Sequence, residues 1–218
     1  NQIKLSGTIG IGHVRWATHG KPSTVNAHPH SSDNVSVVHN GIIENSTILK
    51  KILEKKGYKF KSQTDTEVIV HLVTDYLKKN NLKDTIIKVL KKLHGSFALG
   101  IIFKDQPDLI IGARRGSPLA VGYGPDEHYL GSDSYALKSM TNKISYLNDG
   151  EFCILKKDQV EFFDSDGIKT NKEVLNLSKD EQNYEKGQYK YFMAKEIDEQ
   201  PVTIKNCINE YIDRHNNE

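Results

Sequence analysis

Residues 97–113 read FALGIIFKDQPDLIIGA, in which a polar turn separates two short apolar runs. Apolar runs of this length between turn residues are typical of buried β-strands. The pattern repeats toward the C-terminus and is interrupted only by a short helical stretch at residues 134–140. We therefore expect a β-meander, with strands at residues 97–103, 109–113, 119–123, 129–132, 151–155 and 159–163.

Before the meander, the apolar residues recur with the period of a helix. Three helices are expected, at residues 45–57, 65–77 and 84–94. Asn45 is a suitable N-cap and Gly57 a suitable stop for the first of them. Two shorter stretches look like strands, at residues 35–39 and 58–61. Helices grouped before a meander predict an α+β fold with antiparallel sheets, and not a parallel doubly wound fold.

The composition is that of a globular domain, since 37% of the 218 residues are hydrophobic. No apolar run approaches the roughly 18 residues that cross a bilayer, and residues 1–12 do not resemble a signal peptide. Cys153 and Cys207 are far apart and suggest neither a disulfide framework nor a CxxC metal site. We expect a cytoplasmic protein without a membrane partner.

The formal net charge is only +2, and the many lysines alternate with apolar residues at helical or strand spacing. This spacing is typical of the solvated faces of helices and strands. Nucleic acid is therefore not expected as a partner.

Residues 17–33 contain glycine and prolines that prevent regular structure, and we expect a long loop there. Long irregular loops within compact domains are uncommon and often functional. The loop follows Arg15, one of only four arginines beside 26 lysines. An arginine in such a lysine-rich chain indicates a position where the planar guanidinium is needed.

The string RWATHG at residues 15–20 could bind a small carboxylate. The Arg15 guanidinium can hold two oxygens at once, and the side chains of Thr18 and His19 can add further hydrogen bonds. The alternative is a surface arginine beside a packed Trp16, with no role in binding.

Asn40 and Gly41 follow the alternating residues 35–39 and allow two interpretations. Asn-Gly after such a stretch is first of all a signal for a β-hairpin turn. The pair can instead form an oxyanion hole, in which the Asn40 amide and the Gly41 N–H point at one position. The missing Cβ of Gly41 would leave the approach to that position open.

The string TDTE at residues 64–67 stands at the start of the second expected helix. Asp65 or Thr66 is suited to the N-cap position there. The Asp65 carboxylate could instead receive the ammonium group of a substrate. Together with Arg15, it would then recognise the two charged ends of an amino acid.

Five histidines in the first 39 residues raise the question of a metal site. Their spacings match no standard zinc pattern such as HExxH, so no metal is expected. The histidines concerned are His13, His19, His28, His30 and His39.

Longer strings resemble the class II, Ntn-type glutamine amidotransferases, and within them the glucosamine-6-phosphate synthase group. They occur in the order of that family across nearly the whole chain. The strings are GHVRWATHGKPSTVNAHPH at residues 12–30, VVHNGIIEN at 37–45, TDTEV at 64–68, GSPLAVG at 116–122 and FMAKEIDEQP at 192–201.

The resemblance implies an Ntn-hydrolase four-layer αββα sandwich with antiparallel sheets, which hydrolyses L-glutamine to glutamate and ammonia without a cofactor. Asn40 and Gly41 would form its oxyanion hole. Trp16 would belong to the loop that closes over glutamine and helps gate ammonia transfer. The residues that would hold the ends of the glutamine are Arg15, Thr18, His19 and Asp65.

In this family the nucleophile is an N-terminal cysteine whose own α-amine is the general base, whereas the present sequence starts with Asn1. Neither Cys153 nor Cys207 has such an amine beside it. We therefore expect residues 1–190 to be an N-terminally truncated amidotransferase domain that does not itself hydrolyse glutamine.

Residues 191–218 are expected to form a helical linker toward sugar-isomerase domains, which are absent from the sequence and would bind fructose 6-phosphate. The whole protein would be a homo-oligomer that converts fructose 6-phosphate to glucosamine 6-phosphate. Two alternatives stay open: a non-catalytic binding or oligomerisation module, and a metallohydrolase built on the histidines.

Overall fold

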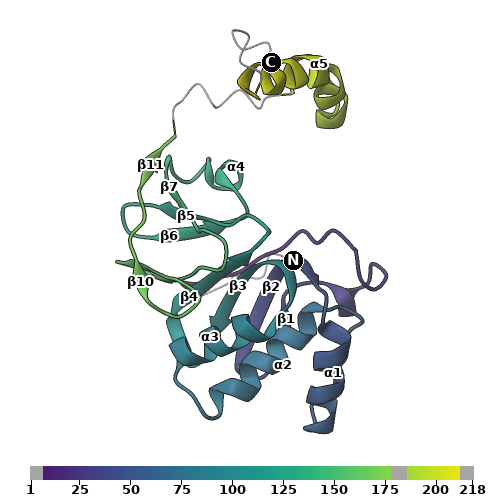
Figure 1. Cartoon of the computed structure of the whole chain (residues 1–218), viewed down its shortest axis with the longest axis vertical. Helices are drawn as coiled ribbons and strands as arrows, with labels where there is room; N and C mark the ends of the chain where they lie inside the picture. Colours follow the sequence, from purple (N-terminus) through teal and green to yellow (C-terminus); the bar gives the residue numbers. More distant parts are fainter. Residues whose placement is uncertain (1–6, 178–185, 212–218) are drawn as a thin grey trace. The chain divides into compact units, whose positions relative to one another are not determined.

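The computed structural model describes residues 7–177 and 186–211 (Figure 1). The chain divides into two compact units, Asn1–Leu177 and Ser178–Glu218. In the second unit α5 spans Phe192–Tyr211, where the sequence predicts a helix. The domain boundary predicted after residue 190 stays a prediction, and residues 178–185 and 212–218 of the predicted segments lie outside the described residues.

Both sheets belong to the first unit and are antiparallel throughout (Figure 1). The larger sheet has seven strands in the order β1 (His30–Ser31), β2 (Val35–Ile43), β3 (Gly95–Phe103), β4 (Gln106–Arg115), β8 (Phe152–Lys156), β9 (Val160–Phe163) and β10 (Lys169–Thr170). The smaller sheet has four strands in the order β11 (Leu175–Asn176), β7 (Lys143–Tyr146), β5 (Ala120–Tyr123) and β6 (His128–Gly131).

Three helices pack on one face of the seven-stranded sheet: α1 (Ser46–Lys55), α2 (Thr66–Leu77) and α3 (Leu82–Lys92) (Figure 1). Their apolar sides and that face of the sheet form the largest core, in which Ile69 and Leu99 are fully buried. Burial of each such side chain contributes about 1.5–3 kcal/mol. This packing fixes α2, whose first turn reaches the candidate site.

Two further cores complete the layers of the first unit. One lies between the two sheets, where Ala98 of β3 and Leu155 of β8 pack with Val121 of β5. The other joins the small sheet to the short helix α4 (Ser134–Leu137), with Leu137 and Ile144 fully buried. The layers therefore run helix, sheet, sheet, helix, and the predicted antiparallel α+β sandwich is confirmed.

Asn40 and Gly41 do not form a hairpin turn, so that interpretation is wrong. Both residues lie within β2, which pairs with β3 over its whole length. Asn40 lies opposite Ala98, and Gly41 lies opposite Phe97. The long pairing of two nine-residue strands outweighs the local turn preference of Asn-Gly.

The strand predicted at residues 58–61 is also wrong. Tyr58 and Phe60 pack instead against the largest core, with their rings 5.2 and 4.6 Å from the ring of His71 on α2. The segment therefore lies on the helical side of the domain, where no strand is at hand to pair with it. Conversely, the sequence patterns miss β7 and the two-residue strands β1, β10 and β11.

One helix boundary differs because of a cap. The third helix begins at Leu82, two residues before its predicted start, because the Asn81 side chain accepts a hydrogen bond from Asp84 N at 2.9 Å. Among residues 7–177 and 186–211, no helix combines the length and the apolar character that crossing a bilayer requires.

Candidate functional site

A cavity of about 250 Å³ opens where β2 and the first turn of α2 meet the long N-terminal loop. The structure brings together here all seven residues that the sequence selected, although they come from three separate segments. These residues are Arg15, Trp16, Thr18, His19, Asn40, Gly41 and Asp65. The other residues of its wall are His13, His28, His39, Ile42, Thr64 and Thr66.

Gly41 lies where the backbone of β2 approaches β3 most closely. Its φ of 126° is a conformation that residues with a side chain rarely adopt. A Cβ on Gly41 would also overlap the carbonyl of Ser96 and the Cα of Phe97. Only glycine fits, and its backbone is left accessible to the cavity beside the Asn40 side chain.

Asp65 stands at the N-cap position of α2, but its side chain does not cap the helix. Instead, Oδ2 accepts a hydrogen bond from the backbone N–H of Ile43 at 2.7 Å, and the residue is buried. The helix start is therefore tied to the end of β2. Within the described residues no group donates to Oδ1, which leaves one carboxylate oxygen for a ligand.

Glu67 holds the segment that leads to Asp65. Its carboxylate accepts hydrogen bonds from Lys61 N at 2.8 Å and from Ser62 N at 2.7 Å. Burial alone would raise the pKa of Glu67, but these hydrogen bonds outweigh burial and lower it. A charged Glu67 thus fixes the turn that carries Thr64 and Asp65.

Arg15 directs its guanidinium at its own loop. Nη2 donates to His19 O at 2.6 Å and to Gly20 O at 2.9 Å, and Nη1 donates to Lys21 O at 3.4 Å. Its φ of 43° lies in the left-handed region, which is unusual for a non-glycine residue. Arg15 therefore closes the loop in this structure, and within residues 7–177 and 186–211 no group accepts from its Nε–H.

Trp16 is 93% exposed, so the alternative of a packed tryptophan is wrong. Thr18 and His19 are also exposed, on the same loop. The loop thus carries an unpacked indole and two polar side chains at the rim of the cavity.

Sequence patterns did not identify the hydrogen bonds of the histidines in the cavity wall. His28 Nε2 and His39 Nδ1 both lie 3.0 Å from the hydroxyl of Thr66, and His13 Nε2 lies 2.6 Å from Asn40 Oδ1. The rings of His13 and His28 are 4.5 Å apart. The unusual density of histidines in residues 13–39 is the one sequence signal that points to this group.

His28 and His39 are uncharged at neutral pH. Burial, followed by the electrostatic effect of the neighbouring His13, lowers the pKa of His28 to about 3. Burial likewise lowers the pKa of His39 to about 4, although Asp65 opposes the shift. At neutral pH both rings are therefore hydrogen-bonding groups. In the part of the chain that the structure describes, no three His, Cys, Asp or Glu side chains are arranged to hold a metal.

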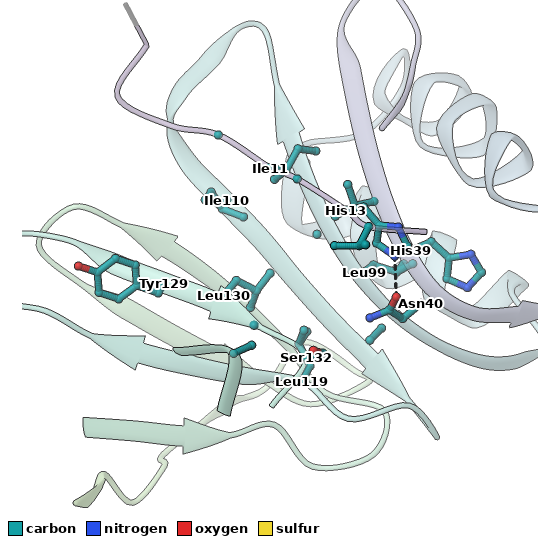
Figure 2. A pocket seen from close by; sticks show the side chains of 18 of the residues that line it. Ile11, His13, His39, Asn40, Leu99, Ile110, Leu119, Tyr129, Leu130 and Ser132 are labelled. Atoms are coloured by element: carbon teal, nitrogen blue, oxygen red, sulfur yellow. Dashed lines mark hydrogen bonds between the residues drawn. The ribbon is translucent and has the colours of Figure 1, made fainter. Parts of the chain in front are cut away.

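A second cavity of about 700 Å³ adjoins the first and lies between the two sheets (Figure 2). Figure 2 shows Leu99 and Ile110 on the large sheet facing Leu130 on the small one. His13 and Asn40 belong to the walls of both cavities. The polar site thus opens into an apolar space within the sandwich.

No cysteine of the first unit lines either cavity. Cys153 is fully buried between the sheets, and burial raises the pKa of its thiol, which makes it a poor nucleophile. Cys207 is an exposed residue of α5. The walls of the site therefore offer donors and a carboxylate but no thiol.

The sequence matches the glutamine amidotransferase domain family over residues 15–139, so the chain belongs to that family. Its similar curated relatives carry the name glutamine–fructose-6-phosphate aminotransferase [isomerizing]. The relative from Mesorhizobium japonicum is 51% identical over 211 residues, which are 96% of this chain and 35% of that protein. The relative from Bradyrhizobium diazoefficiens is 49% identical over 210 residues, 96% of this chain and 34% of that protein.

A solved structure of similar fold is the glutamine phosphoribosylpyrophosphate amidotransferase from B. subtilis, complexed with ADP and GMP. It has a TM-score of 0.57 and 30% identity, over 70% of this chain and 34% of that one. The predicted membership of the Ntn-type amidotransferases is confirmed. The chain spans about a third of the length of the curated relatives that it matches.

Proposed function

We propose that the 250 Å³ cavity binds L-glutamine and that the chain is the glutaminase part of an enzyme that converts fructose 6-phosphate to glucosamine 6-phosphate. The observation that carries this proposal is the convergence of Arg15, Asn40 and Asp65 from three segments onto one cavity of a glutamine amidotransferase domain. The names of the curated relatives support the choice of sugar.

The two charged ends of glutamine have complementary partners in the cavity. The open Oδ1 of Asp65 receives the α-ammonium group. The α-carboxylate is held by Arg15, either through its Nε–H or by exchange of a loop carbonyl for a substrate oxygen. Thr18 and His19 add hydrogen bonds from the loop, and closure of that loop brings Trp16 over the substrate.

The side-chain amide of glutamine then lies beside Asn40 and Gly41. A thiolate attacks the amide carbon, and the Asn40 amide N–H and the Gly41 backbone N–H stabilise the negative oxygen of the tetrahedral intermediate. The amide nitrogen takes up the proton that the thiol gave to the general base and leaves as ammonia, and a glutamyl thioester remains. Water hydrolyses this thioester to glutamate and regenerates the thiol. These reaction steps need no metal or organic cofactor.

The attacking thiol is the group that the walls of the cavity do not supply. Cys153 is buried between the sheets, and neither Cys153 nor Cys207 has a free α-amine of its own, so we propose that the thiol comes from a cysteine outside this sequence. By resemblance to the family, it would be an N-terminal cysteine with its own amine as the base. Ammonia and fructose 6-phosphate would meet in sugar-isomerase domains of a cytoplasmic, homo-oligomeric whole protein.

The test is Asn40→Ala in the full-length protein, with glutamate release as the readout. Loss of one oxyanion donor should lower kcat by ~10²–10³-fold. Near-normal turnover would remove Asn40 from the oxyanion hole.

A non-catalytic glutamine-binding module is the second candidate, favoured by the absence of a thiol from the cavity walls. Glutamate release by the full-length protein distinguishes the two functions. The purified 218-residue chain should release none, and release would contradict our placement of the thiol.

A further inference from the structure

His13 makes two hydrogen bonds that together define its chemical state. Its Nδ1 accepts from the backbone N–H of Arg15 at 2.8 Å, and its Nε2 lies 2.6 Å from Asn40 Oδ1. A backbone N–H can only donate, so Nδ1 carries no hydrogen and the ring is neutral. The single ring hydrogen is therefore on Nε2, which donates to Asn40.

This donor fixes the orientation of the Asn40 amide. A flipped amide would place its own N–H groups against Nε2–H, so two donors would face each other. The Nε2–H of His13 thus selects the orientation in which Oδ1 is occupied. Among the described residues nothing accepts from Asn40 Nδ2, so the NH2 group is the end of the amide that remains free. Figure 2 shows the bond to His13 beside the inter-sheet cavity.

The ring of His13 contacts the ring of a second histidine, His28. His28 lies with its ring 4.5 Å from that of His13, at an angle of 33°. His28 is in turn held by Thr66 Oγ1 at 3.0 Å, on the first residue of α2. The position of the Asn40 amide is thereby linked to the helix that also presents Asp65.

We propose that His13 is a positioning residue that presents the Nδ2 amine of Asn40 to the oxyanion of the reaction. The inference rests on the proposed glutaminase function and adds to it the group that orients the donor. Because His13 acts through Asn40, its removal should lower kcat and leave glutamine binding nearly unchanged.

Two substitutions separate the two hydrogen bonds of His13. In His13→Asn, the side-chain oxygen can replace Nδ1 as the acceptor for Arg15 N, but nothing reaches Asn40. In His13→Gln, the longer side chain can place its amide N–H near the position of Nε2 and donate to Asn40. His94→Asn, at an exposed histidine outside the cavity, controls for loss of an imidazole as such.

The experiment measures kcat and KM for glutamate release in the full-length protein. His13→Asn should lower kcat by at least ~10-fold, less than the ~10²–10³-fold expected for Asn40→Ala, with KM changed by less than about 3-fold. His13→Gln should recover most of the lost kcat, and His94→Asn should leave both constants unchanged. In the Asn40→Ala background, His13→Asn should have no further effect, because its target is gone.

Four results would overturn the inference: an unchanged kcat in His13→Asn, a loss confined to KM, equal losses in His13→Asn and His13→Gln, or an additive loss in the Asn40→Ala background. Each of these leaves Asn40→Ala severely impaired, so the proposed function survives. If Asn40→Ala itself keeps normal turnover, the oxyanion assignment fails, and the role of His13 fails with it. Glutamine titration of each variant checks that the site is folded.

Discussion

Asp65 Oδ2 accepts a hydrogen bond from Ile43 N at 2.7 Å, which joins the start of α2 to the last residue of β2. The same carboxylate lines the candidate site, so one side chain has a structural oxygen and a free oxygen. Strand β2 also carries Asn40 and Gly41. The bond therefore sets the spacing between the proposed ammonium site and the proposed oxyanion hole.

Asp65→Asn should separate these two roles. The variant keeps an oxygen that can accept from Ile43 N, but it loses the charge that pairs with the substrate ammonium. We expect glutamine affinity to fall by at least ~10-fold in calorimetry, with little change in stability. Asp65→Ala also leaves Ile43 N unpaired and should lower the free energy of unfolding by about 1–3 kcal/mol in urea titrations. Equal stability of the two variants would contradict the structural role.

Gly41→Ala should destabilise the domain more than an alanine at another glycine of similar backbone conformation. Gly57 is the matched control, because its φ of 92° is also positive but a Cβ there would meet nothing within 4 Å. Gly57→Ala should therefore show only the left-handed strain, about 1–2 kcal/mol. Gly41→Ala adds the overlap with the Ser96 carbonyl. Similar unfolding free energies for the two variants would contradict the close approach of β2 and β3.

Arg15→Lys should weaken glutamine binding without unfolding the protein. The guanidinium of Arg15 donates to three loop carbonyls and has a further N–H for a ligand. A single lysine ammonium cannot replace this planar arrangement of donors. We expect at least ~10-fold lower affinity in calorimetry. Arg114→Lys is the control, because Arg114 donates to Leu147 O away from the cavity. An unchanged affinity in Arg15→Lys would exclude Arg15 from the binding site.

Stability should fall on acidification from pH 7 to pH 5. The pKa values of His28 and His39 are lowered to about 3 and about 4, so only the unfolded chain takes up their protons near its ordinary pKa of 6.5. The free energy of unfolding therefore decreases as pH falls below about 6.5, by at most about 1.4 kcal/mol per pH unit for each histidine. The decrease from these two groups ends near their folded pKa values. His30 and His71, whose pKa values are also lowered, add to it.

The slope of the unfolding free energy against pH identifies the contribution of His39. His39→Gln should reduce the pH dependence of the unfolding free energy between pH 7 and pH 5, whatever it does to stability at pH 7. The same change at exposed His94 serves as the control. A slope in His39→Gln equal to that of the unchanged protein would show that His39 is not buried in its neutral form.

The sequence predicts those helices and strands whose hydrophobic pattern extends over several consecutive residues. The helical period located α1 to α3, and the apolar runs located most strands of the large sheet and two of the four strands of the small one. Two-residue strands such as β10 carry no periodicity and are set by the sheet edge that they join. The segment at residues 58–61 alternates like a strand, yet its aromatic rings pack on His71 instead of joining a sheet.

For the site, the motifs located seven residues that do line one cavity. Their hydrogen bonds were not predictable, because that of Asp65 joins distant segments and those of Arg15 depend on the path of its own loop. Asp65 is one of two cap candidates in the sequence but bonds to Ile43, and Arg15 is a candidate for binding a carboxylate but holds its own loop. The histidines suggested at most a metal site, whereas the structure shows them bonded to Asn40 and Thr66.

The most direct test of the glutamine site is a calorimetric titration of L-glutamine into the 218-residue chain. Binding does not require a thiol, so we predict a saturable 1:1 interaction with L-glutamine and none with D-glutamine, whose α-groups cannot reach Asp65 and Arg15 together. The same titration of Asp65→Asn should show at least ~10-fold weaker binding. No binding of L-glutamine, or equal binding of the two enantiomers, would contradict the assignment of this cavity.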